Sequence, residues 1–209
     1  MTRIDKICSL IDSCESFADV GCDHGFCTQY ALKAGLCDKA YITDISAKSL
    51  EKAQTLLTDY IESGKCIPVC CDGLAGIPKD IEQVLIAGMG GNEIIKILKE
   101  GFIPRKFIFQ PMKNVRLVRE FLIEQGCKIT FDGVFEDQKY YFVIKGESEG
   151  GTGSYTQAEL QFGKDSLKDP VFFGYAKEEL KKKLEYTKLG GSKEILEEIR
   201  LLKEVLKCS

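Results

Sequence analysis

Two spacings of apolar residues alternate along most of the chain. Short apolar runs that end in Gly or in a turn pair, such as Val-Leu-Ile-Ala at 84–87, predict buried strands. Helical spacing separates them: Ile4, Ile7, Cys8 and Ile11 follow i, i+3, i+4, i+7. We expect strands at 17–21, 40–44, 66–71, 84–87, 106–110, 128–135 and 140–145, and helices at 1–16, 26–34, 47–61, 92–99 and 115–124.

Strands that alternate with helices form a parallel sheet with right-handed crossovers. The last two expected strands surround Asp137-Gln138, which predicts a terminal antiparallel hairpin. The expected fold class is therefore α/β, a Rossmann-like sheet closed by a hairpin. That arrangement is typical of class I methyltransferases and is lacking in most dehydrogenases.

The rest of the chain has a different pattern. A segment rich in Gly and Ser at 148–155 predicts a linker. Helical stripes at 175–188 and 192–207, separated by Gly190-Gly191, predict a helical hairpin narrow enough to be a coiled coil. We expect a domain over 1–147, the linker, and a helical appendage over 156–209, which either packs as a lid or contacts RNA.

Composition limits the function classes. The 209 residues are 44% hydrophobic and 29% charged, with a net charge of −3, as in a globular protein with no overall attraction to nucleic acid. No apolar stretch is long enough for a membrane helix, and the charged residues near the N-terminus do not fit a signal peptide. We therefore expect a cytoplasmic protein with no membrane partner.

The chain has ten cysteines and one histidine. No CxxC spacing occurs, so we interpret the cysteines as reduced thiols. Cys22, Cys66, Cys70 and Cys71 lie in or beside expected strands, where a thiol packs as a small apolar group. A single histidine makes a Cys/His zinc site improbable, and we expect no metal.

The chemistry-bearing residues follow the strands, and parallel sheets bind ligands at the carboxyl ends of their strands. The first strand ends in Asp19-Val20-Gly21-Cys22-Asp23, where Gly21 allows close backbone approach. Asp23 replaces the second Gly of the dinucleotide fingerprint and would repel a pyrophosphate, which disfavours NAD. A carboxylate-rich loop suits a cofactor that carries cationic groups, such as S-adenosylmethionine (SAM).

Two further acids follow the next strands. Asp44 comes 23 residues after Gly21, a spacing suited to binding ribose hydroxyls; alternatively it caps the next helix, a role that Ser46 could fill. Asp72-Gly73 either meets an adenine ring or forms an ordinary turn.

Two more strand ends carry glycine or proline. Gly88-Met89-Gly90-Gly91 follows the fourth strand, which suggests a backbone packed against a ligand or a flat base. Gln110-Pro111 ends the fifth strand. Together these strand ends predict one ligand site.

The motifs at these strand ends resemble the bacterial TrmK-type tRNA (adenine-N1)-methyltransferases. The matching residues are 18–24 (Ala-Asp-Val-Gly-Cys-Asp-His), 71–74, 86–91 (Ile-Ala-Gly-Met-Gly-Gly), 110–111, 117–120, 136–137 and 140–141. The resemblance covers about 15–147 and also implies a C-terminal coiled-coil hairpin. It implies SAM as cofactor and tRNA as partner.

The resemblance and the strand ends together assign site residues. Expected cofactor-binding residues are Asp19, Gly21, Cys22, Asp44, Ile45, Asp72, Gly73, Gly88 and Met89. Expected catalytic residues are Asp23 and His24, although Asp23 could instead hold the cofactor and His24 could be structural. Expected substrate-binding residues are Phe26, Gly90, Gly91, Gln110, Pro111 and Arg119.

The chain departs from the family pattern at four positions. Cys22 stands where the family has Ser, Gly25-Phe26 where it has Ala-Tyr, Met112 where it has Asn, and Asp44 where it has Glu. Two alternatives stay open: a SAM methyltransferase with another substrate, and a non-catalytic tRNA-binding protein of the same fold.

Overall fold

The computed structural model describes residues 2–188, 190 and 192–207 of the chain. In this part, one seven-stranded sheet has the order β3-β2-β1-β4-β5-β7-β6. Strands β1 to β5 are parallel, and β7 pairs antiparallel with both β5 and β6. The strands are β1 (Cys14–Val20), β2 (Cys37–Asp44), β3 (Cys66–Cys70), β4 (Gln83–Ala87), β5 (Lys106–Gln110), β6 (Lys128–Asp137) and β7 (Lys139–Glu147).

Helices cover both faces of the sheet. Residues of α1, α2 and α3 share one core with one set of strand residues, and residues of α5 and α6 share a second core with the opposite set. Successive residues of a strand point to opposite faces, so Phe17 belongs to the first core and Ala18 to the second. The helices are α1 (Arg3–Cys8), α2 (Phe26–Lys33), α3 (Ala47–Leu56), α4 (Thr58–Glu62), α5 (Gly91–Glu100) and α6 (Val115–Glu124).

The expected Rossmann-like sheet with its terminal hairpin is confirmed, and two of the expected helices are shorter. The helix expected over 1–16 is α1 alone, because the chain from Cys14 onward pairs with β2 through Cys37. The helix expected over 47–61 divides at Leu57, whose fully buried side chain and non-helical backbone separate α3 from α4.

The C-terminal appendage packs on β6 through a third core. The residues shared across this core are Val134, Phe162, Phe172, Ala176, Leu201 and Leu202. Its elements are α7 (Gln157–Phe162), η1 (Ser166–Lys168), α8 (Pro170–Thr187) and α9 (Lys193–Lys207). Neither α7 nor η1 was expected, although the capping box of Thr156 and Glu159 marks the start of α7.

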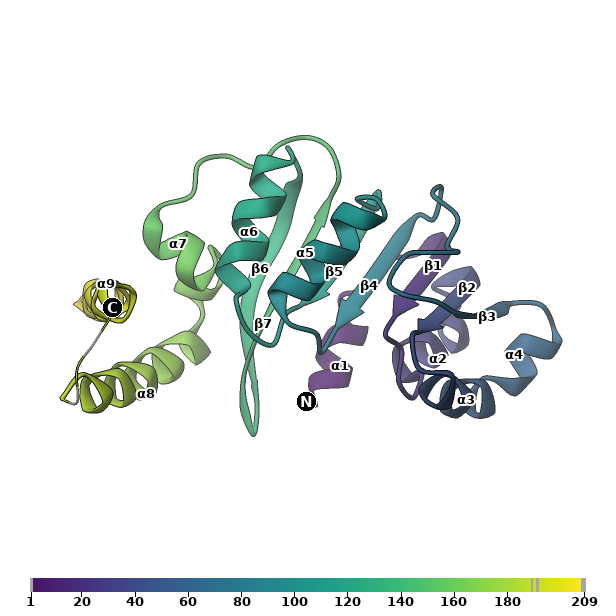
Figure 1. Cartoon of the computed structure of the whole chain (residues 1–209), viewed down its shortest axis with the longest axis horizontal. Helices are drawn as coiled ribbons and strands as arrows, with labels where there is room; N and C mark the ends of the chain where they lie inside the picture. Colours follow the sequence, from purple (N-terminus) through teal and green to yellow (C-terminus); the bar gives the residue numbers. More distant parts are fainter. Residues whose placement is uncertain (1, 189, 191, 208–209) are drawn as a thin grey trace.

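The two long helices are present as expected, but their arrangement is not an extended coiled coil. Figure 1 shows α9 end-on while α8 lies across the view, so the helices cross where they pack. Their apolar residues pack against each other and share one core with β6. Gly191, expected in the break between them, lies outside the described residues.

The Gly/Ser-rich segment 148–155 is fixed along β6 rather than free. The Thr152 hydroxyl accepts a hydrogen bond from the Ile129 N–H (2.7 Å) and donates one to the Cys127 carbonyl (2.7 Å). The Tyr155 hydroxyl donates to Asp132 (3.3 Å). The segment therefore connects the appendage to the sheet as an ordered strap; the domain limits themselves stay a prediction.

Candidate cofactor-binding cleft

A cleft of about 490 Å³ opens at the carboxyl ends of β1, β2 and β4. Parallel strands end on the same edge, so residues that follow different strands meet there. The lining residues are Arg3, Ile4, Asp19, Gly21, Cys22, Asp23, His24, Phe26, Cys27, Asp44, Leu85, Ala87, Gly88 and Met89. Nine of the residues expected to bind or act on ligands are thus brought together: Asp19, Gly21, Cys22, Asp23, His24, Phe26, Asp44, Gly88 and Met89.

The loop after β1 depends on glycine. Gly21 has φ +72°, and a Cβ there would collide with the Met89 side chain. The N–H groups of Gly21 and Cys22 both donate to the Thr43 carbonyl, at 2.8 and 3.0 Å. These bonds fix the loop at the end of β2, so its backbone faces the cleft in one conformation.

Asp19 is a buried carboxylate at the floor of the cleft. Its side chain accepts a hydrogen bond from the Thr28 hydroxyl at 2.9 Å. Burial raises the pKa of Asp19 to about 6, and the Thr28 hydrogen bonds oppose that rise. A carboxylate with so little solvation is suited to a cationic ligand group.

Asp23 and His24 lie at the rim. The Asp23 side chain is 61% exposed, and its carboxylate contacts Lys52 Nζ at 3.2 Å and His24 Nε2 at 3.7 Å. The His24 ring stacks on Phe26, with centroids 5.5 Å apart. Asp23 is therefore accessible to a substrate but shares its charge with a lysine from α3.

The sequence left open whether Asp44 caps α3 or is available to a ligand, and the structure gives the cap to Ser46. The Ser46 hydroxyl accepts the Ser49 N–H at 3.3 Å and caps α3. Asp44 Oδ1 accepts the Ser46 N–H at 2.8 Å, and its side chain lines the cleft. The helix cap is thus Ser46, which leaves Asp44 available for a ligand; Ile45 beside it is 72% exposed.

Asp72 and Gly73 follow β3 and line a different hollow. This pocket, of about 340 Å³, lies between the loop after β3 and the end of α5. Asp72 is paired there with Lys96 at 3.7 Å, and the Gly73 carbonyl accepts the Thr43 hydroxyl at 3.3 Å. The structure does not bring these two residues into the cleft lined by Asp19 and Asp44.

Several residues expected to bind the substrate instead make contacts within the protein. A Cβ on Gly91 would meet the backbone oxygens of Lys113 and Asn114, so its glycine serves loop packing. Gln110 is fully buried, accepting from Arg3 Nη1 (2.9 Å) and donating to the Pro111 carbonyl (3.2 Å). Gly90 lies under the Lys113 side chain, and Pro111 is buried. These positions shape the edge of the cleft without lining it.

The expectation that Arg119 contacts the substrate is wrong. Its side chain is fully buried and pairs with buried Asp132 at 2.8 Å. It also donates to the carbonyls of Leu160 and Gln161 in α7. Arg119 therefore joins α6, β6 and the appendage through Nε and Nη1, while its buried Nη2 has no hydrogen-bond partner among the described residues.

Sequence reasoning missed Arg3 and Lys52. Arg3 lines the cleft from α1, and Lys52 of α3 contacts the Asp23 carboxylate at its rim, so both come from helices rather than strand ends. No local motif marks either residue, since each is one of two basic residues on its helix. Only the packing of α1 and α3 on the sheet decides that they reach the site.

The nine described cysteines are free thiols, and Cys208 lies outside the described residues. Among the described residues, no group of three or more His, Cys, Asp or Glu side chains could hold a metal ion. In the same part of the chain, each helix is too short or too polar to span a bilayer.

A family profile described as "Methyltransferase domain" matches residues 1–144. A "Putative tRNA methyltransferase" of Mycoplasma pneumoniae is 29% identical over 146 residues, which cover 68% of each chain. "Putative tRNA methyltransferase MG248" of Mycoplasma genitalium is 30% identical over 152 residues, covering 68% of this chain and 66% of that protein. The chain belongs to the methyltransferase domain family.

Solved structures share the whole fold. TrmK of M. capricolum, solved with S-adenosyl-homocysteine, has a TM-score of 0.89 at 21% identity, covering 99% of this chain and 97% of that one. The B. subtilis M1A22 tRNA methyltransferase TrmK has a TM-score of 0.86 at 23% identity, covering 98% and 97%. The similarity includes the appendage, so sheet and helices together form one shared architecture.

Proposed function

We propose that this chain binds SAM in the cleft and methylates N1 of an adenine in tRNA. The observation that carries the proposal is the acidic cleft at the carboxyl ends of β1 and β2, where a glycine loop separates buried Asp19 from Asp44. The names of the two curated relatives and of the TrmK structures support tRNA as the substrate class. A tRNA substrate places the activity in the cytoplasm.

The cleft residues fit the parts of SAM. Asp19 would bind the ammonium group, because its buried carboxylate has one hydroxyl donor, Thr28, and no salt-bridge partner among the described residues. Asp44 is placed to accept hydrogen bonds from ribose hydroxyls. Gly21 and Cys22 provide the backbone along which the cofactor lies, with Gly88 and Met89 opposite. Ile45 follows Asp44 at the cleft, and Asp72 and Gly73 line the neighbouring hollow, so the adenine ring would extend from the cleft toward these three residues.

When bound, SAM supplies an electrophilic methyl group on its sulfonium. Adenine N1 already carries a lone pair, so the chain needs no general base; it must hold an unpaired base in line with the methyl. The exposed His24–Phe26 stack, at the cleft rim, provides an aromatic surface for such a base. Asp23 is the proposed catalytic carboxylate, since methylation makes the ring cationic.

The test is methyl transfer from labelled SAM to an unmodified tRNA transcript, followed by digestion to nucleosides. We expect 1-methyladenosine, and its loss in Asp23→Ala, with Asp38→Ala as a control acid that is absent from the cleft lining. SAM binding without any labelled nucleoside would support a different substrate or a binding role. Another labelled nucleoside would contradict adenine N1 as the target.

A further inference from the structure

Arg3 enters the cleft from the first turn of α1 and is fixed by three contacts. Its N–H donates to Asp137 Oδ2 at the tip of the β6–β7 hairpin, at 2.7 Å. Its guanidinium Nη1 donates to the buried Gln110 Oε1 at 2.9 Å, and lies over the Tyr141 ring at 5.7 Å. The backbone of Arg3 is thus held at the hairpin tip and its side chain at β5 and β7, which pre-organises the guanidinium for binding.

The charge of Arg3 is exceptional at this site. The cleft lining includes three carboxylates, Asp19, Asp23 and Asp44, and Arg3 is the only lysine or arginine among the described lining residues. A guanidinium has five N–H donors, and one is used in the side-chain hydrogen bonds within the described part of the chain. The remaining donors are free to bind an anion.

Asp44, Asp19 and Arg3 lie in that order along the cleft. The sheet order places β2 on one side of β1, and β4 and β5 on the other. Asp44 therefore marks one end, Asp19 the middle, and Arg3 the other end, where its Nη1 lies 3.4 Å from the position of a Cβ on Gly88. A ligand that places its ribose at Asp44 and its ammonium at Asp19 would extend its next group toward Arg3.

We propose that Arg3 binds the α-carboxylate of the cofactor, so that Arg3 and Asp19 together recognise its zwitterionic amino-acid end. The proposal rests on the proposed function, because it assumes the SAM orientation given above. An RNA phosphate could also attract a guanidinium, but Arg3 is half-buried and anchored to fully buried Gln110. This location favours a small carboxylate inside the cleft over a backbone phosphate at its rim.

The test compares two ligands that differ at the amino-acid end. S-adenosylhomocysteine carries the carboxylate, whereas 5′-methylthioadenosine has the same nucleoside and sulfur without it. Titration calorimetry of Arg3→Gln should show S-adenosylhomocysteine affinity lowered about tenfold to a hundredfold, as for loss of a charge-assisted hydrogen bond. Methylthioadenosine affinity should be unchanged, and Arg3→Lys should retain part of the discrimination.

Lys6→Gln is the matched control, because Lys6 is a cation of the same helix that lies over Phe131 and not in the cleft lining. Asp44→Ala should weaken both ligands alike, since both carry ribose. Equal losses of both ligands in Arg3→Gln would show a structural role only and overturn the proposal. Unchanged affinity for both, with weaker tRNA binding, would assign Arg3 to RNA and overturn it too. Failure of the unmodified protein to bind either ligand would instead contradict the proposed function.

Discussion

Asp19 shows how a residue proposed to bind the cofactor can lower the stability of the fold. Its pKa is raised to about 6 because the folded protein buries the carboxylate, while in the unfolded chain the pKa is near 3.8. The protonated form is therefore favoured by folding. Its stabilising contribution is present below about pH 3.8 and is lost as the pH rises through 6. At neutral pH the buried carboxylate is ionised, and this lowers the free energy of unfolding.

We expect Asp19→Asn to raise the free energy of unfolding of the ligand-free protein by about 1–3 kcal/mol at pH 7.5. The gain should shrink as the pH falls from 6.5 to 4, which urea unfolding at several pH values would measure. The same variant should bind S-adenosylhomocysteine more weakly, because the ammonium loses its carboxylate. A variant that is less stable than the original at pH 7.5 would contradict this account of Asp19.

Gly21 allows a second test at the residue scale, with Gly35 as the matched control. Both glycines have positive φ, +72° and +65°, but a Cβ on Gly21 meets Met89 and one on Gly35 meets nothing within 4 Å. Alanine at either position should cost about 1–2 kcal/mol of stability through backbone strain. Only Gly21→Ala should also lower S-adenosylhomocysteine affinity, and equal affinities in the two variants would exclude a special role for this loop.

The buried Arg119–Asp132 ion pair connects α6 with β6, and Arg119 also connects both with α7. Both side chains are fully buried, and Arg119 reaches α7 as well as β6. Burial raises the pKa of Asp132, while the adjacent guanidinium lowers it. Removal of the guanidinium leaves a buried carboxylate without its charge partner.

Arg119→Ala should destabilise the protein by about 3–5 kcal/mol, as for other buried ion pairs that lose one partner. The loss should shrink as the pH falls, because burial raises the pKa of Asp132 and a protonated Asp132 needs no charge partner. Arg116→Ala on the same helix, which breaks a part-exposed pair with Glu120, should cost about 1 kcal/mol or less. Chemical denaturation measures both; similar losses in the two variants would contradict the structural role of Arg119.

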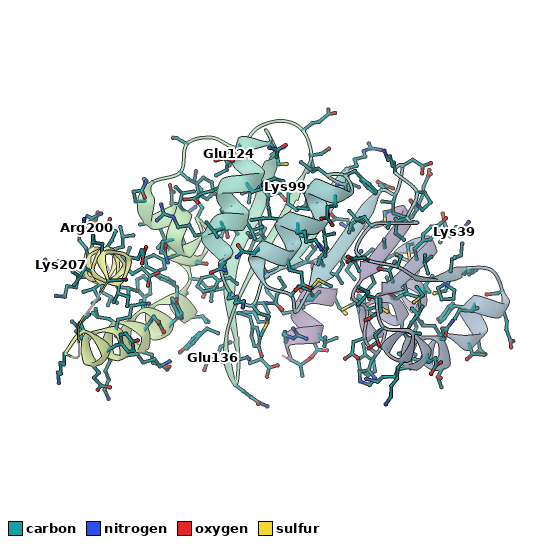
Figure 2. All side chains as sticks on the ribbon, in the orientation of Figure 1. Lys39, Lys99, Glu124, Glu136, Arg200 and Lys207 are labelled. Atoms are coloured by element: carbon teal, nitrogen blue, oxygen red, sulfur yellow. The ribbon has the colours of Figure 1, made fainter. Side chains whose placement is uncertain are left out.

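At the scale of the molecule, charge is dispersed. The appendage region 155–209 has 11 Lys and Arg against 10 Asp and Glu, and the rest of the chain has 18 against 22. Many appendage cations are paired within it: Lys183 contacts Glu198, and Arg200 contacts Glu197 and Glu204. Figure 2 shows the labelled cations Lys39 and Lys207 at opposite ends of the molecule, with Lys99 between them. No overall positive field attracts RNA, so local contacts must do so.

We therefore expect tRNA binding that depends on salt but less steeply than in strongly basic proteins. A slope of log affinity against log salt of about −3 to −5 would correspond to roughly three to six phosphate contacts. Fluorescence titration of a labelled tRNA between low and physiological salt measures it. Affinity that stays constant over this range would contradict an RNA contact through phosphates.

The sequence by itself determined the strands of the sheet, most of the helices and most of the cleft. The strand ends at Gly21, Asp44 and Gly88 were predictable because apolar runs stop at glycine or acid, and parallel strands must end on one edge. It could not determine that Leu57 divides a helix, because burial by distant residues, and not spacing, interrupts α3 there. The sequence also could not predict that Arg119 is buried, since its partners come from β6 and α7.

Only the tertiary structure decided which basic residues face the cleft and how the appendage packs. Arg3 and Arg119 each lie on a helix that carries a second cation, yet one enters the cleft and the other is fully buried. The physical reason is that local spacing fixes which side of a helix is apolar, whereas helix docking fixes what its polar side meets. Contacts between residues more than a hundred positions apart, such as Arg3 with Gln110 and Asp137, exist only after the sheet has assembled.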